Sequence, residues 1–189
     1  MRLRQGAVIA YPTDSCYALG CQLDDKDAAE RLRKIRKFDR HHQFTLVSRD
    51  LSQIATYARI DNWQFRLLKQ VTPGPYTFVL AATKELPRRI AHDKRKTIGI
   101  RIPDHVIAQS LLETLGEPII SCTLAFPGED DAVADPEEWR EQLDRAVDVV
   151  ILGGHCGLEP TTVVDLSGAT PELLRKGKGA IEPLGLPED

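Results

Sequence analysis

The chain has 189 residues, of which 42% are hydrophobic and 28% charged, and its formal net charge is −3. This composition is typical of one soluble domain with a buried core, and no apolar run approaches the roughly 20 residues of a membrane span. It also argues against a protein that binds nucleic acids through a uniformly basic surface. The four cysteines show neither CxxC pairing nor the spacing of metal ligands, so we expect a reduced, cytoplasmic setting and no metal site.

Strand-like and helix-like segments alternate along the chain. Strands are predicted at residues 7–10, 44–47, 76–82, 97–102, 119–123, 147–152 and 161–165, and helices at residues 28–35, 63–68, 106–115 and from 136 onward. Capping residues set the helix boundaries, namely Asp24 or Asp25, Asp61, Gly116, and Asp135 with Pro136. This alternation predicts an α/β (α+β) domain with a mixed sheet.

A compact polar segment, residues 13–17, follows the first predicted strand. The strand should end at Pro12, because proline cannot donate a hydrogen bond within a sheet. In an open α/β sheet, ligands bind at the loops that leave the carboxyl ends of strands. A solvated turn is rich in the same residue types. These residues alone therefore leave a small-ligand platform and an ordinary turn as alternatives.

Basic residues gather in two segments, 31–42 and 84–96, which indicates either solvated faces or an anionic ligand. Within the first segment, Lys34 and Arg36 would point about 200° apart on a continuous helix. They converge on one ligand only if the helix ends between them or directly after them. The loss of helical periodicity after Lys37 predicts such an end. The alternative is that both cations stabilise the negative end of the helix dipole.

Hydroxyl side chains accompany two of the predicted strands. Ser121 and Thr123 share one face at the end of their strand, and Thr161 and Thr162 begin another. Such pairs suit a carboxylate or phosphate oxygen, although loops commonly contain them as well. His155 has no acid or serine partner in the sequence, so a hydrolase triad is not supported.

Together, these segments resemble the YrdC/YciO family, whose best-known activity is threonylcarbamoyl-adenylate synthesis. The resemblance keeps the order of the blocks and covers nearly the whole chain. It is carried by residues 11–14, 17–20, 34–36, 73–77, 98–101, 121–123, 160–165 and 174–175. It is closest for the YciO branch, through residues 36–50, 83–103 and 135–138.

The resemblance implies a single YrdC-like domain over residues 1–189, with a twisted, open sheet and a concave, basic face. In the family's reaction the amine of L-threonine captures carbon dioxide from bicarbonate as a carbamate, which attacks the α-phosphorus of ATP and releases pyrophosphate. The product, threonylcarbamoyl-AMP, serves the modification of tRNA at adenosine 37. Mg²⁺ is expected with ATP, with no protein ligand assigned. The family's face resembles a double-stranded RNA-binding shape, so a double-stranded RNA or tRNA-binding module is the alternative.

The resemblance also implies a set of site residues by position. The catalytic residues would be Lys34, Arg36 and Ser121. Threonine and its carbamate would contact Thr13, Tyr17, Thr77, Arg101, Ser121 and Thr123, and the nucleotide would contact Lys34, Arg36, Thr162 and Arg175. Cys16 and Cys122 are expected to be structural, because the chemistry needs no thiolate.

Two departures from the family's pattern bear on activity. Its synthases usually read Lys-x-Arg-Pro, whereas Lys37 follows Arg36 here, and they usually read Ser-x-Ser-Ala-Asn, whereas Leu124 and Ala125 follow Thr123. The missing Asn removes a donor and an acceptor for the ligand, and the missing Pro relaxes the loop after Arg36. We therefore expect an intact cationic pocket with weakened synthase activity. The family usually has a helix before its first strand, so the chain is expected to be short or to begin downstream of that helix.

Overall fold

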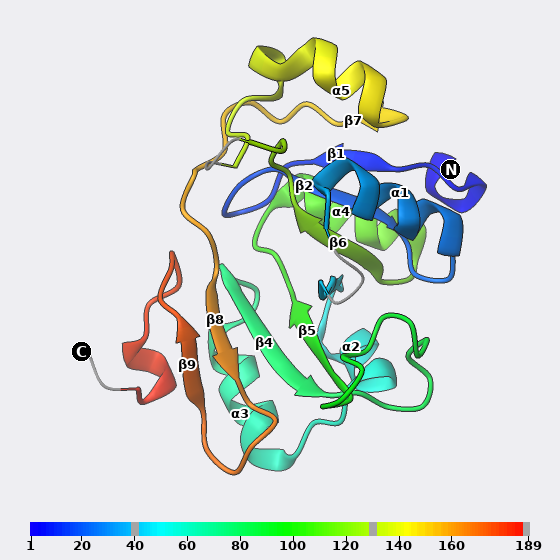
Figure 1. Cartoon of the computed structure of the whole chain (residues 1–189). Helices are drawn as coiled ribbons and strands as arrows, with labels where there is room; N and C mark the ends of the chain where they lie inside the picture. The colour runs from blue at the N-terminus through cyan, green and yellow to red at the C-terminus, as the bar shows by residue number, and fades with distance from the viewer. Residues whose placement is uncertain (39–41, 129–131, 187–189) are drawn as a thin grey trace.

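A computed structural model describes residues 1–38, 42–128 and 132–186 of the chain (Figure 1). Within these residues one sheet has the strand order β7 (Val149–Val150), β1 (Ile9–Tyr11), β2 (Ala18–Gln22), β6 (Ile119–Thr123), β3 (Thr45–Val47), β5 (Thr97–Arg101), β4 (Tyr76–Ala81), β8 (Thr162–Asp165) and β9 (Glu172–Arg175). The pairs β1/β7, β3/β5 and β4/β8 are parallel and the remaining neighbours are antiparallel. The predicted mixed α/β sheet is therefore confirmed.

Five α-helices lie within the described residues: α1 (Lys26–Arg36), α2 (Leu51–Tyr57), α3 (Asn62–Val71), α4 (Val106–Leu115) and α5 (Arg140–Ala146). Short 3₁₀ turns cover Arg2–Gln5, Pro136–Trp139 and Glu182–Leu184. In Figure 1, α2 and α3 lie behind the half of the sheet formed by β5, β4 and β8, whereas α1 and α4 accompany β1, β2 and β6. None of the described helices combines the length and the apolar character needed to cross a membrane.

Alternation along the strands separates a covered face of the sheet from an open one, because successive side chains point to opposite sides. On β4, Phe78 is fully buried in the main core together with Ile54 of α2 and Leu68 of α3. Thr77 and Val79 point the other way and line a cavity instead. The face that α2 and α3 leave open therefore becomes the floor of a pocket.

The half of the sheet around β1, β2 and β6 is packed on both faces. Ile119 of β6 is buried in a second cluster with Ile9 of β1 and Leu112 of α4. Its neighbour Ile120 belongs to the main core, which also contains Leu32 of α1. Two successive residues of β6 thus serve different cores, as strand alternation requires.

Helix caps account for most of the predicted boundaries. The Asp25 carboxylate accepts a hydrogen bond from the Ala28 N–H at 2.9 Å, so Asp25 rather than Asp24 is the N-cap of α1. Gly116 ends α4 with φ at +79°, as predicted. The start predicted at Asp135 begins as a 3₁₀ turn, and α5 follows it only from Arg140. The predicted strand at 147–152 shortens to β7, and the sequence patterns do not predict β2, α2 and β9.

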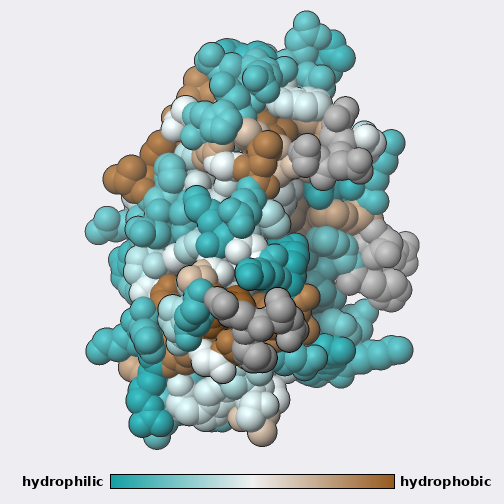
Figure 2. All heavy atoms as spheres, turned by 90° about the vertical axis from the view of Figure 1, so that its left-hand side faces the viewer, coloured by the Kyte–Doolittle hydropathy of each residue, from teal (hydrophilic) through white to brown (hydrophobic). Residues whose placement is uncertain are grey.

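The segment after β9 packs tightly against the sheet. The Tyr76 hydroxyl donates to the Ala180 carbonyl at 2.9 Å, and the Thr162 hydroxyl donates to the Gly179 carbonyl at 2.6 Å. A Cβ at Gly179 would lie 2.4 Å from the Tyr76 ring, so only glycine allows this approach. Seen from this side, the surface is mainly hydrophilic, with hydrophobic residues in small separate areas (Figure 2).

Candidate functional site

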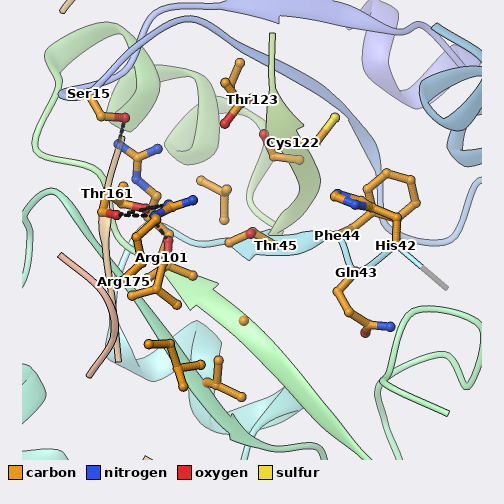
Figure 3. Close-up of a pocket in the computed structure, with 18 of the residues that line it drawn as sticks. Ser15, His42, Gln43, Phe44, Thr45, Arg101, Cys122, Thr123, Thr161 and Arg175 are labelled. Atoms are coloured by element: carbon orange, nitrogen blue, oxygen red, sulfur yellow. Dashed lines mark hydrogen bonds between the residues drawn. The ribbon is translucent and has the colours of Figure 1, made fainter. Parts of the chain in front are cut away.

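The open face of β3, β5 and β4 forms the floor of a cavity of about 460 Å³ (Figure 3). This volume lies within the range of small-molecule sites. Four arginines and seven hydroxyl side chains are among its described lining residues: Arg36, Arg95, Arg101, Arg175, Ser15, Thr45, Thr77, Thr97, Ser121, Thr123 and Thr161. Such a lining favours an anionic ligand with several oxygen atoms.

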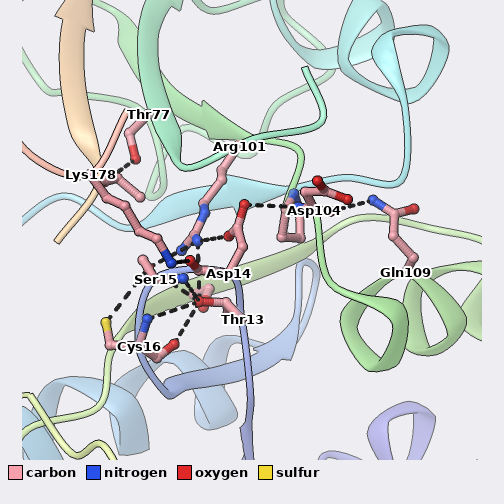
Figure 4. Close-up of polar contacts among 12 residues, drawn as sticks. Thr13, Asp14, Ser15, Cys16, Thr77, Arg101, Asp104, Gln109 and Lys178 are labelled. Atoms are coloured by element: carbon pink, nitrogen blue, oxygen red, sulfur yellow. Dashed lines mark hydrogen bonds and ion pairs between the residues drawn. The ribbon is translucent and has the colours of Figure 1, made fainter. Parts of the chain in front are cut away.

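Arg101 is the most enclosed cation of this pocket, with a side chain that is 9% exposed. Its Nη2 donates to the Ser15 hydroxyl at 2.9 Å, to the Thr13 hydroxyl at 3.1 Å and to the Asp14 carboxylate (Figure 4). The other carboxylate oxygen of Asp14 accepts from the Asp104 N–H at 2.9 Å. These contacts fix one edge of the guanidinium, and its buried Nε has no hydrogen-bond partner among the described residues. The fixed group is therefore preorganised to donate to a ligand.

Thr13 and Tyr17 support the pocket from behind its wall rather than lining it. The Thr13 hydroxyl donates to the Cys16 carbonyl at 2.6 Å, which closes the polar loop after β1. The Tyr17 hydroxyl donates to the Gly154 carbonyl and accepts from the Gly153 N–H, both at 2.9 Å. The polar loop thus has internal partners for its hydroxyls and presents Ser15 and Cys16 to the cavity.

Thr161, and not its neighbour Thr162, faces the cavity. Its hydroxyl lies 2.9 Å from that of Thr77, and Arg175 Nη2 donates to its carbonyl at 3.0 Å. Thr162 is fully buried, and its hydroxyl accepts from the Gly177 N–H at 3.1 Å. Of the predicted nucleotide residues on this wall, Arg175 reaches the pocket and Thr162 stabilises the turn beneath it.

The predicted end of the first helix is confirmed, since α1 ends at Arg36 and Lys37 has the left-handed φ of +50°. Arg36 lines the pocket, its Nη1 donates to the Ala125 carbonyl at 2.6 Å, and its guanidinium lies 4.8 Å from the centre of the Phe38 ring. Lys34 is exposed and does not line the pocket, so the structure does not bring the predicted pair together. A proline could not replace Lys37 in this conformation, because its φ is fixed near −65°.

Ser121 and Thr123 both line the pocket, as does Cys122 between them, but the surroundings of the two hydroxyls differ. The buried Ser121 hydroxyl donates to the Leu19 carbonyl at 2.7 Å and lies 2.9 Å from the Tyr11 hydroxyl. Burial, partly offset by the hydrogen bond to Ser121, raises the pKa of Tyr11 to about 12. Thr123 is exposed at the rim, where its hydroxyl can reach a ligand.

Burial also raises the pKa of the Cys122 thiol, to about 12, although Cys122 lines the cavity. The thiol is therefore neutral near pH 7 and is a poor nucleophile. Within the described ranges, no group of three or more His, Cys, Asp and Glu side chains could hold a metal ion.

Sequence reasoning did not single out several lining residues, among them Thr45, Thr97 and Arg95. Thr45 and Gly99 are partners across β3 and β5, and the absence of a side chain at Gly99 leaves space beside Thr45. The alternation of side chains along β3 and β5 could have placed Thr45 on the same face of the sheet as Gly99. Arg95 lay within the basic segment 84–96, but composition alone does not show which of its cations faces a pocket.

Comparisons with known proteins agree with this geometry. Residues 1–177 match the sequence model of the Sua5/YciO/YrdC family, described as telomere recombination. The uncharacterized Escherichia coli protein YciO is 52% identical, and its crystal structure has a TM-score of 0.91 over 96% of this chain and 88% of that chain. A threonylcarbamoyl-AMP synthase of Neisseria gonorrhoeae is 30% identical over 92% of this chain and 90% of the relative. The crystal structure of P. abyssi Sua5 complexed with L-threonine is 28% identical, with a TM-score of 0.85 over 93% of this chain and 52% of that chain.

Proposed function

The chain belongs to the Sua5/YciO/YrdC family, and we propose that it is an enzyme of the threonylcarbamoyl-AMP synthase type. In the proposed reaction the amine of L-threonine adds to carbon dioxide supplied by bicarbonate and loses a proton, which gives a carbamate. A carbamate oxygen attacks the α-phosphorus of ATP, the bond from this phosphorus to the bridging oxygen breaks, and pyrophosphate leaves. The product, threonylcarbamoyl-AMP, would serve the threonylcarbamoylation of tRNA at adenosine 37.

One observation carries this proposal: four arginines and seven hydroxyl side chains converge on a single cavity. The reaction brings a carbamate and a polyphosphate together, so its main requirement is positive charge that is already in position. It requires no covalent nucleophile, which agrees with a Cys122 thiol that stays protonated.

The Arg101 end of the pocket is suited to the amino acid. Guanidinium groups bind carboxylates through charge-assisted hydrogen bonds, and Arg101 lines the cavity with its position fixed by the side chains of residues 13–15. Thr123 would complete the contacts to the threonine and carbamate oxygens, whereas Ser121, whose hydroxyl already donates to the Leu19 carbonyl, would contribute to this wall as Thr13 does. The L-threonine in the solved P. abyssi Sua5 complex supports this ligand class.

Arg36 and Arg175 would contact the phosphates and the ribose of the nucleotide, because both line the same cavity. Thr13, Tyr17 and Thr162 would contribute by holding the walls, since their hydroxyls already have internal partners. Mg²⁺ would enter bound to the phosphates of ATP.

We expect weaker activity than in synthases with the Ser-x-Ser-Ala-Asn motif. At the position of the Asn, Ala125 has no polar side chain, and Arg36 already uses its carbonyl. The nucleotide would therefore lack the contacts of one donor and one acceptor on the protein. Part of the Arg36 guanidinium would also already be hydrogen-bonded to the protein before the ligand binds.

Calorimetric titration tests the proposed function. ATP should bind with a measurable heat, and pyrophosphate should be released only when L-threonine and bicarbonate are both present. The alternative is the double-stranded RNA or tRNA-binding module. If ATP does not bind at millimolar concentration while double-stranded RNA binds with a steep salt dependence, the RNA-binding function replaces the enzymatic one.

A further inference from the structure

The loop that joins β4 to β5, residues 82–96, brings Arg95 to the pocket. A turn at its end is closed by His92, whose Nδ1 accepts from the N–H groups of Lys94 and Arg95, each at 3.2 Å. The His92 carbonyl also accepts from the Lys96 N–H at 2.9 Å, and the His92 N–H donates to the Thr97 carbonyl at 2.8 Å. These bonds attach the turn to the first residue of β5. Arg95 therefore stands at a defined position on the pocket's edge.

Arg95 differs from the other arginines of the lining in what its guanidinium contacts. Arg36, Arg101 and Arg175 each donate to a protein oxygen within 3.1 Å. The nearest acid to Arg95 is Asp165, at 3.7 Å, which exceeds hydrogen-bond length. Among the lining arginines of the described chain, Arg95 is thus the one whose guanidinium N–H groups are all available to a ligand.

Asp165 lies close enough to orient the Arg95 guanidinium but does not form a hydrogen bond with it. Its Oδ1 accepts from the backbone N–H and the hydroxyl of Ser167, at 2.8 and 2.6 Å, which fixes the carboxylate. Its Oδ2 faces Arg95, whose side chain is 66% exposed. The Asp165 side chain is only 11% exposed, but at 3.7 Å it makes no hydrogen bond to Arg95, so Arg95 can turn to a ligand without breaking one.

The position of Arg95 relative to β5 indicates which part of a ligand it meets. Thr97 and Arg101 are the two ends of this strand, and their Cα atoms are roughly 13 Å apart at about 3.3 Å per residue. Both line the same cavity, with Arg95 beyond the Thr97 end. An amino acid bound at Arg101 therefore leaves Arg95 to an anionic group at the far end of an extended ligand.

We infer that Arg95 binds the terminal phosphates of the nucleotide, the part that leaves as pyrophosphate. The inference rests on the proposed function, because it assigns one part of the proposed substrate to one residue. It also gives this chain a second phosphate-binding arginine beside Arg36 at the outer part of the pocket, whereas Lys34 is exposed outside the lining. A guanidinium fork matches phosphate oxygens better than an ammonium does.

Titration calorimetry with ATP, AMP and inorganic pyrophosphate tests the inference. Arg95→Ala should weaken binding of ATP and of pyrophosphate by about tenfold or more, the effect of losing hydrogen bonds to a charged group. Binding of AMP should stay unchanged, and Arg95→Lys should recover part of the loss. Arg88→Ala is the matched control, because Arg88 is exposed on the same loop and does not line the pocket.

Equal losses for AMP and ATP, an unchanged Arg95→Ala variant, or an equal loss in Arg88→Ala would overturn the inference. An unaltered protein that binds neither ATP nor pyrophosphate would overturn it as well. If pyrophosphate binds through Arg95 but ATP yields no product with threonine and bicarbonate, the proposed function fails and the phosphate site stands.

Discussion

The two ends of the pocket are built differently. At the inner end, defined by Arg101 and the loop of Thr13, Asp14 and Ser15, the guanidinium is 9% exposed and held by three side chains. At the outer end, defined by Arg36, Arg95 and Phe38, Arg95 is 66% exposed and makes no hydrogen bond through its side chain among the described residues. The inner end is thus assembled before a ligand binds, whereas the outer end still has hydrogen-bond donors available for the ligand. The difference predicts that inner changes affect folding and that outer changes affect binding.

Removal of the inner cation should have the largest effect. Arg101→Ala leaves the Asp14 carboxylate nearly buried without its partner, and breaking a buried pair in this way costs about 3 kcal/mol of unfolding free energy. Urea denaturation measures the loss, and Arg88→Ala, at an exposed position outside the pocket, is the control. A variant as stable as the parent would show that the inner end is not preassembled.

At the outer end, the same kind of substitution should affect ligand binding more than stability, because Arg36 has no buried ionic partner and loses only its hydrogen bond to the Ala125 carbonyl. Arg36→Ala should weaken ATP binding by about 1.5–3 kcal/mol, the range for hydrogen bonds to charged groups. Lys34→Ala should change it little, because Lys34 is exposed and outside the pocket lining. Calorimetry on both variants makes the comparison, and equal losses would mean that a diffuse basic surface binds ATP.

Alkaline pH should destabilise the folded protein through Cys122, which lines the pocket, and Tyr11, which is buried beside Ser121. Burial raises the pKa of Cys122 from 9.0 to about 12 and that of Tyr11 from 10.0 to about 12. Because each pKa is higher in the folded state, the unfolded chain loses these protons first. The two groups therefore do not lower the free energy of unfolding below pH 9, and they lower it progressively as the pH rises toward 12. Cys122→Ala should reduce the loss between pH 9 and 10 by about 1 kcal/mol. Urea denaturation at each pH measures the free energy of unfolding. If it falls equally with pH in the parent and in Cys122→Ala, the prediction is wrong.

Substitution of the pocket thiols should have the smallest effect. Cys16 and Cys122 both line the cavity, yet neither supplies a charge or a strong donor to a ligand. Cys16→Ala should leave ATP affinity within about twofold of the parent, in the same titration series as Arg36→Ala. A loss that matches Arg36→Ala would give the thiol a direct role.

Sequence patterns predict the regular elements well where periodicity and caps coincide. The predicted helix at 106–115 and strand at 119–123 have the observed bounds of α4 and β6. The sequence does not reveal β2, because its first four residues are buried on both faces and show no alternation. It also misses α2, whose seven residues are too short for a clear helical period.

The site was harder to predict than the fold, because side-chain direction depends on register. The hydroxyl pair Thr161 and Thr162 could be placed at a strand, but a shift of one residue decides which of them faces the pocket. Arg36 reaches the pocket because α1 ends directly after it, a boundary that the sequence predicts. The position of Arg95 depends on a turn that the His92 side chain closes, and no periodic sequence pattern predicts such a turn.

Formation of the adenylate itself tests the central claim most directly. The protein, incubated with ATP, L-threonine and carbon-13-labelled bicarbonate, should yield threonylcarbamoyl-AMP that carries the label, as detected by mass spectrometry. Arg36→Ala, with its folded state checked by circular dichroism, should reduce the yield strongly. Unlabelled or absent product, with pyrophosphate release that does not depend on threonine, would contradict the account.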